Sequence, residues 1–177
     1  QIQAFSAHLE ELSQERLETL KSATGILGKI LTGHLIAEEL LGICLEVRSP
    51  NPEQLEKANL RFFQKVHLVK AFQALPEITD DLWPLLFKLN ALRNHLAHDL
   101  GQTKLEALAA DFVALVQKSQ SKSAELADRF DLDEPVLIDA EADDALFQAL
   151  HYTLGGLQMI TIWTYHLDAL MTRKMSS

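Results

Sequence analysis

Five polar side chains that could do chemistry lie within seven positions of a segment otherwise rich in Leu and Ala (LNALRNHLAHDL, residues 89–100): Arg93, Asn94, His95, His98 and Asp99. Histidine titrates near neutral pH and can move a proton, and the arginine guanidinium is a fixed cation suited to an anion. At helical spacing Asn94 and His98 share one face, and Arg93 lies on a neighbouring flank. The segment predicts either a site that joins proton transfer to anion binding, or a polar helix end.

The end of this predicted helix gives its histidines further roles. The helix dipole favours the protonated form of His98 there, and Asp99 can orient its ring. His95 and His98 are three residues apart, a spacing found among metal ligands, but no Asp/Glu-x-x-His partner on another helix completes a ligand set. We therefore expect no metal site and no cofactor.

A second polar group falls on the apolar sides of two predicted helices. His34 and Glu38 are four residues apart and can touch, whereas Glu39 points towards solvent. A carboxylate on a core stripe is costly unless it is paired, and Lys65 of the following helix is the expected partner of Glu38. The Glu38–Lys65 pair either fixes the register of two helices or takes a direct part in catalysis.

The elements that must position these groups are helical, because apolar residues recur with a period near 3.6 along the chain. The expected architecture is an all-α bundle of one domain, residues 1–177, with short connections and a long C-terminal helix. The acidic, Pro-containing stretch 128–144 is expected to be a solvated connector, or else a loop that imitates nucleic acid. The expected helices cover residues 4–21, 22 or 24 to 47, 53–75 with a break near Asn59, 81–98, 103–127 and 143–173.

Apolar stripes predict which faces are buried. They comprise Leu27, Ile30, Leu31, Leu41 and Leu45 in the second helix; Arg61, Phe62, Val66, Val69 and Phe72 in the third; and Leu82, Leu85, Leu86, Leu89, Leu92 and Leu96 in the fourth. The lone Cys44 is expected to be a small buried hydrophobe rather than a nucleophile. Gly155-Gly156 lies inside a helical pattern, which predicts a close approach by another backbone there.

The last helix carries an unusually extensive apolar set: Leu146, Leu150, Leu154, Leu157, Ile160, Trp163 and Leu167. Such a set predicts a homodimer, unless this helix packs back across its own bundle.

Composition limits the classes of function. The chain is 47% hydrophobic and 23% charged with a formal net charge of −9, a balance typical of soluble globular proteins. The negative charge argues against strong binding to duplex DNA but leaves room for a small basic site acting on RNA. Polar residues that include His34, Glu38, Glu39 and Glu46 interrupt the longest apolar run, 26–47, and the chain opens without a secretory pattern. We expect a cytoplasmic protein with no membrane association.

The run "RNHLAH" resembles the Arg-x4-6-His signature of HEPN domains. The resemblance covers residues 25–100, where an apolar helix carries an internal Glu ("GHLIAEELL") and precedes a helix of the form "FFQKVHLVKAF". The same arrangement is similar to the mannitol operon repressor family, which shares the helical layout and varies at the motif.

The HEPN resemblance implies an all-α fold that dimerises so that two motifs line one cleft and cleave RNA without metal. Arg93 and His98 match the signature positions, and Asn94 matches the usual polar one. A histidine suits transfer of the 2′-hydroxyl or leaving-group proton, and a guanidinium suits the charge of a phosphorane. The implied protein is a toxin or stress-related ribonuclease restrained by an antitoxin or another regulatory protein. The alternative is a non-catalytic regulator of the mannitol operon repressor type, which acts through protein–protein contacts.

Overall fold

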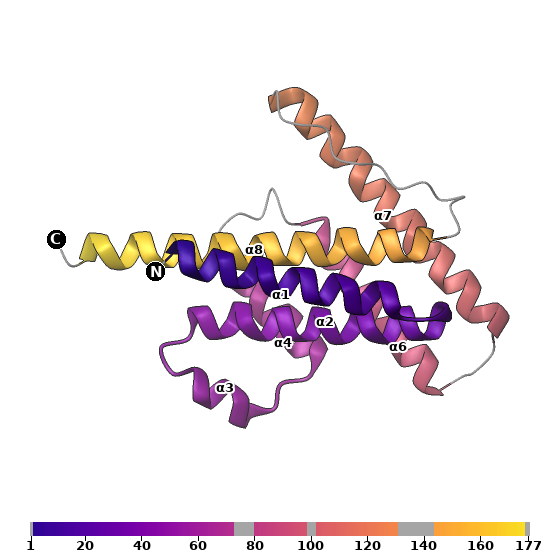
Figure 1. The fold of residues 1–177 in the computed structure, drawn as a ribbon, viewed down its shortest axis with the longest axis horizontal. Helices are drawn as coiled ribbons and strands as arrows, with labels where there is room; N and C mark the ends of the chain where they lie inside the picture. The colour runs from indigo at the N-terminus through magenta and orange to yellow at the C-terminus, as the bar shows by residue number, and fades with distance from the viewer. Residues whose placement is uncertain (1, 73–79, 99–101, 131–143, 176–177) are drawn as a thin grey trace.

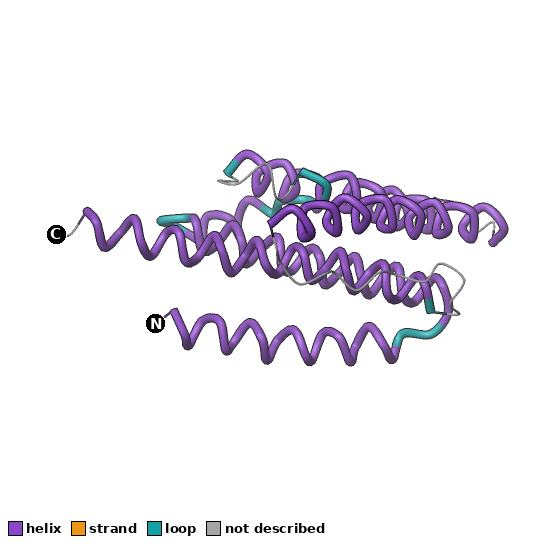
Figure 2. The backbone as a smooth tube through the Cα atoms, turned by 90° about the horizontal axis from the view of Figure 1, so that it is seen from above, coloured by secondary structure: helices purple, strands orange, loops and turns teal. Residues whose placement is uncertain are grey.

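The computed structural model of the chain describes residues 2–72, 80–98, 102–130 and 144–175, and the side chains of 2–6, 10, 98, 102, 123–130 and 167–175 lie outside this description. These ranges contain seven helices and no strand (Figures 1 and 2), which confirms the predicted all-α bundle with a long C-terminal helix. The helices are α1 (Ile2–Ser22), α2 (Gly25–Arg48), α3 (Pro52–Ala58), α4 (Phe62–Ala71), α6 (Leu82–His98), α7 (Gln102–Phe130) and α8 (Ala145–Met175).

Helix α2 is the centre of the bundle. It packs most extensively against α8 and also contacts α1, α4 and α6. α1, α2 and α8 run along the long axis of the molecule, whereas α7 crosses α8 steeply and extends beyond the other helices (Figure 1). Seen from above, α1 lies along one edge (Figure 2). α6 completes the core by packing on α2, α4, α7 and α8.

The predicted third helix is two helices, separated at the expected residue. Asn59 adopts a left-handed backbone conformation (φ 47°, ψ 50°), which ends α3, and Asn tolerates this conformation better than most residues. Pro52 begins α3, where its missing N–H costs nothing. The side chain of Gln64 accepts a hydrogen bond from the Arg61 backbone N–H at 2.9 Å and so caps the start of α4.

Other boundaries differ from the sequence predictions by a few residues. Residues 128–130 belong to α7 rather than to the acidic connector, and residues 131–143 of that connector lie outside the described part. Gly101, beyond the end of α6, also lies outside it. No helix in the described ranges combines the length and the apolar character needed to cross a membrane.

The α6 stripe is buried throughout, as predicted, but the stripes of α2 and α4 are only partly correct. Leu27 and Leu31 are exposed because α4 begins opposite His34, where Phe62 stacks on that ring, and does not reach the first turns of α2. Arg61 and Phe72, at the two ends of α4, are also exposed.

The apolar face of α8 mostly packs within its own bundle. Its buried residues include Leu150, Leu154, Leu157 and Ile160. The alternative for this helix was therefore correct, and its apolar face no longer argues for a homodimer. Trp163 remains 38% exposed, and the side chain of Leu167 lies outside the described set.

Two further features concern glycine and cysteine. α8 runs through Gly155-Gly156 without a break, and a Cβ at Gly155 would meet no atom within 4 Å. The close approach occurs instead at Gly33, where a Cβ would lie 2.8 Å from Cδ2 of the fully buried Leu150. Cys44 is buried as expected, and burial raises the pKa of its thiol.

These glycines give opposite expectations for the same exchange. Gly33→Ala should lower the free energy of unfolding, because overpacking costs roughly 1–3 kcal/mol and alanine returns only about 1 kcal/mol of helix propensity. Gly155→Ala, in open space on α8, should raise it by about 1 kcal/mol. Urea unfolding followed by circular dichroism measures both, and equal shifts would contradict the close α2–α8 approach.

Candidate functional site

A cleft of about 710 Å³ opens between α2, the α3–α4 connection, the start of α4 and α6. Its walls bring together residues from both polar groups of the sequence: His34 and Glu38 from α2, and Arg93 and Asn94 from α6. The volume lies within the range of small-molecule sites, roughly 300–1,000 Å³. We therefore take this cleft as the candidate site.

The α6 wall carries the arginine and asparagine of the signature. Buried Leu89, Leu92 and Leu96 fix the orientation of the helix, which leaves Arg93 and Asn94 exposed. Nη1 of Arg93 donates to Oδ1 of Asn94 at 3.3 Å, so the asparagine holds the guanidinium beside the cleft.

Part of the predicted site is not described. His98 is the last residue of α6, one turn after Asn94, and its side chain lies outside the described set. Asp99 lies outside the described residues altogether. Of the motif residues, the structure places Arg93 and Asn94 in the cleft.

His34 forms the buried floor of the cleft. Its ring stacks on Phe62 with centroids 4.1 Å apart, and Nε2 lies 3.3 Å from Oδ1 of Asn90. Burial lowers the pKa of His34, the contacts with Asn90 and Glu38 oppose that effect, and the charge of Arg93 adds to it. A neutral ring with the proton on Nε2 can donate to the Asn90 amide oxygen. His34 thereby links α2 to the wall that carries Arg93.

The predicted contact between Glu38 and Lys65 is present. Nζ of Lys65 lies 3.7 Å from Oε1 of Glu38 and donates to the Glu38 carbonyl oxygen at 3.5 Å. Oε2 of Glu38 is 4.0 Å from Nδ1 of His34. The pair ties α4 to α2 at the edge of the cleft, and the ammonium offsets the carboxylate charge there.

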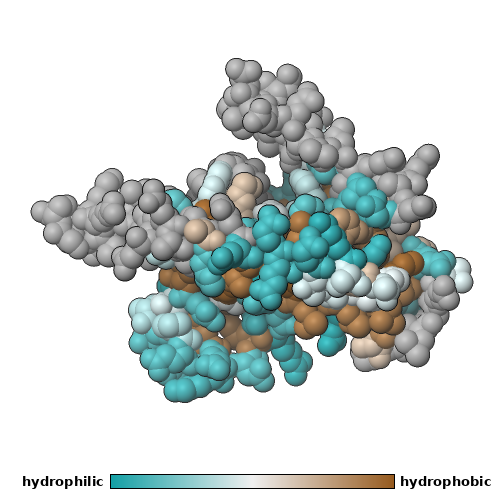
Figure 3. All heavy atoms as spheres, viewed as in Figure 1, coloured by the Kyte–Doolittle hydropathy of each residue, from teal (hydrophilic) through white to brown (hydrophobic). Residues whose placement is uncertain are grey.

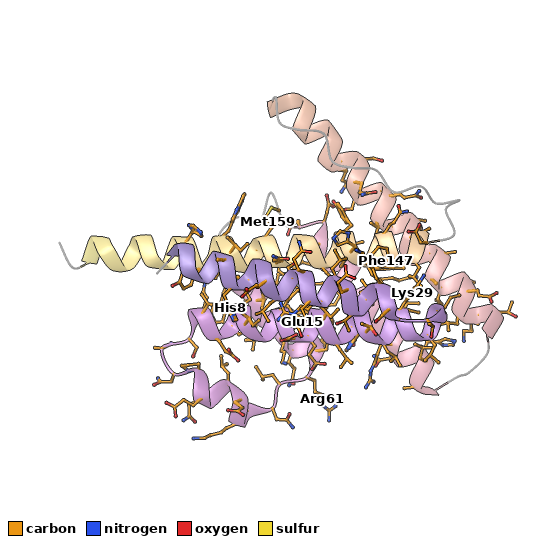
Figure 4. All side chains as sticks on the ribbon, in the orientation of Figure 1. His8, Glu15, Lys29, Arg61, Phe147 and Met159 are labelled. Atoms are coloured by element: carbon orange, nitrogen blue, oxygen red, sulfur yellow. The ribbon has the colours of Figure 1, made fainter. Side chains whose placement is uncertain are left out.

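Among the described residues that line the cleft, the polar ones missed from the sequence are Asn59, Arg61 and Asn90, and the apolar ones are Leu60, Phe62 and Phe63. Asn90 precedes Arg93 by three residues and Asn94 by four, so the rule of helical spacing could have found it. Arg61 had been assigned to a core stripe, but its side chain projects outward from the α3–α4 connection (Figure 4). The left-handed conformation of Asn59 ends α3 two residues before Arg61, and both residues line the cleft.

The cleft is locally positive although the chain is acidic. Two of its residues, Arg61 and Arg93, carry fixed positive charge, and the charge of Glu38 is offset by Lys65. Asn59, Asn90 and Asn94 add neutral hydrogen-bonding groups. Screening limits exposed charges to about 8–10 Å, so this cleft can attract an anion despite the net charge of −9.

A second cavity, of about 40 Å³, lies between α1, α2 and α8. Contacts between helices, rather than groups suited to a ligand, make up its walls. Arg16, in its wall, pairs with Glu39 at 2.8 Å, and the Ser13 hydroxyl donates to Gln158. Glu39 is exposed as predicted, but it has this partner. Among the described residues, no group of three or more His, Cys, Asp or Glu side chains is placed to hold a metal ion.

No protein-family model, curated protein sequence or solved structure matches this chain.

The depressed pKa of His34 predicts a pH dependence of stability. The unfolded chain binds the His34 proton at a pH near 6.5 and the folded chain only at lower pH, so the unfolded state holds more protons between the two values. The contribution of His34 to stability should therefore be complete above about pH 6.5 and fall as the pH drops towards the folded pKa. Urea unfolding from pH 8 to pH 5 should show a smaller fall for His34→Gln than for the wild type, and parallel profiles would reject the assignment.

Proposed function

We propose that this protein is a metal-independent endoribonuclease of the HEPN type, with Arg93 and His98 essential and Asn94 supporting them. One observation carries the proposal. Arg93 and Asn94 of the signature-like segment line a wide cleft with a second arginine, Arg61, and two further asparagine side chains, Asn59 and Asn90. Guanidinium groups bind phosphate oxygens bidentately, and amide groups add neutral donors. This combination suits a phosphodiester better than a neutral ligand.

The chemistry follows from the residue types. His98 removes the proton of the ribose 2′-hydroxyl, the 2′ oxygen bonds to phosphorus, and the bond to the 5′ oxygen breaks. A protonated histidine returns a proton to that oxygen, which leaves a 2′,3′-cyclic phosphate and a free 5′-hydroxyl. Arg93 stabilises the charge on the phosphorane, and Asn94, in contact with Arg93, positions it. The active unit is a homodimer, since two copies supply one histidine as base and another as acid.

The α2 face next to the cleft supports association with another protein. Leu27, Leu31 and Leu35 follow one another at four-residue spacing and are 47%, 39% and 66% exposed. Hydrophobic residues also show on the surface along α2 in Figure 3. His34 and Glu38, which come three residues after Leu31 and Leu35, line the cleft, so two copies joined through these leucines would have neighbouring clefts. An antitoxin or other regulator that covered this face would restrain the enzyme in the cytoplasm.

The alternative is a non-catalytic regulator of the mannitol operon repressor type. The exposed leucines favour it, because an apolar row beside a polar cleft also suits a regulatory partner without any RNA chemistry.

The enzyme hypothesis predicts cleavage of RNA in EDTA. Arg93→Ala and His98→Ala should each slow cleavage of total RNA by about a hundredfold or more, since they remove phosphorane stabilisation and proton transfer. His8→Ala is the matched control, because His8 is exposed on α1 and does not line the cleft (Figure 4). Circular dichroism must show that all variants fold. Intact RNA with the wild type, or equal cleavage by all variants, would leave the regulator as the better explanation.

The dimer is tested by mass in solution. Light scattering at micromolar concentration should give twice the monomer mass for the wild type, and Leu31→Glu with Leu35→Glu should give a monomer, because buried carboxylates would oppose the interface. Met159→Glu is the control, since Met159 is 43% exposed on α8 (Figure 4). A monomeric wild type would contradict the homodimer.

A further inference from the structure

An aromatic ring stands exposed in the wall of the cleft. Phe63 lies in the first turn of α4, lines the cleft with Arg93 and Asn94, and is 52% exposed. Its neighbour Phe62 turns inward and is buried beneath His34. Burial of apolar side chains drives folding, so packing of the core does not explain why Phe63 is exposed.

Two other rings hold Phe63 in place. His67, one turn later on α4, meets it edge-on at a centroid distance of 4.4 Å, and Phe87 of α6 lies at 5.6 Å. His67 and Phe87 are themselves 5.2 Å apart. The three rings form a cluster across α4 and α6, which fixes the exposed ring before any ligand arrives. A fixed ring loses little conformational freedom on binding.

We propose that Phe63 is a stacking platform for a nucleobase, so that the cleft selects single-stranded RNA. This assignment rests on the proposed RNA-binding function and adds a residue that determines specificity. Phe87, which braces the ring, precedes Arg93 by six residues, about 9 Å along the helix axis. A dinucleotide spans that distance, so one base can stack on Phe63 while a neighbouring phosphate meets Arg93. A paired base lies within its own stack and cannot reach the ring.

Stacking on an aromatic ring tolerates any base, because every base has a π face. The platform therefore favours unpaired segments rather than a particular sequence. It also accounts for the composition of the cleft, with cations for the sugar–phosphate chain and one aromatic surface for a base. Glu38, the one carboxylate among the described residues of the wall, is offset by Lys65 and does not repel the strand.

The test measures RNA binding in EDTA, with the full chain carrying His98→Ala to suppress cleavage. Fluorescence anisotropy compares a labelled single-stranded RNA, the matching duplex, and an abasic strand of equal length. Phe63→Ala should weaken binding of the single strand about tenfold, the scale of losing one base–aromatic stack. It should leave binding of the abasic strand unchanged, and Phe63→Trp should restore affinity for the single strand.

Phe72→Ala is the matched control. Phe72 is 51% exposed at the end of α4 but does not line the cleft, so its removal should not alter binding. If Arg93→Ala weakens binding while Phe63→Ala does not, the platform is wrong and the RNA site stands. An equal loss for the abasic strand would show that Phe63 acts only through packing, and this overturns the assignment. If no variant or parent binds RNA, the site and the platform both fail.

Discussion

The close approach of α8 to α2 is the constraint on which the rest of the structure depends. At Gly33 the missing side chain leaves room for the fully buried Leu150 of α8. The next residue, His34, is turned by about 100° around the helix and forms the floor of the cleft. One turn of α2 therefore serves the core on one side and the candidate site on another, so a change in helix packing there would also move the site.

The polar groups around His34 are tolerated because each has a partner. The imidazole contacts Asn90, and burial favours its neutral form. Glu38 is paired with Lys65 at the cleft edge. Once these charges are offset, Arg61 and Arg93 dominate the local field. A chain with a net charge of −9 thus keeps a small positive surface at this cleft, and screening separates that surface from more distant acidic residues.

Several exposed apolar side chains gather around this same region. Leu31 and Leu35 lie on the α2 face that continues into the cleft, and Phe63 stands in its wall. α8, which had seemed to have surplus apolar surface, buries most of that surface in its own bundle. Exposed apolar side chains of the described residues therefore lie beside the signature-like segment, and α8 also exposes Met159 and Trp163.

The sequence by itself determined the helical class, the break at Asn59, the buried stripe of α6 and the Glu38–Lys65 contact, because each depends on local spacing or on one polar residue that needs a partner. Only the tertiary structure decided that Leu27 and Leu31 are exposed, since periodicity cannot tell where a neighbouring helix begins. It also decided that Arg61 and Phe63 face the same cleft as Arg93. That meeting depends on how a left-handed turn aims α4 at α6, and such long-range geometry leaves no local signal in the chain.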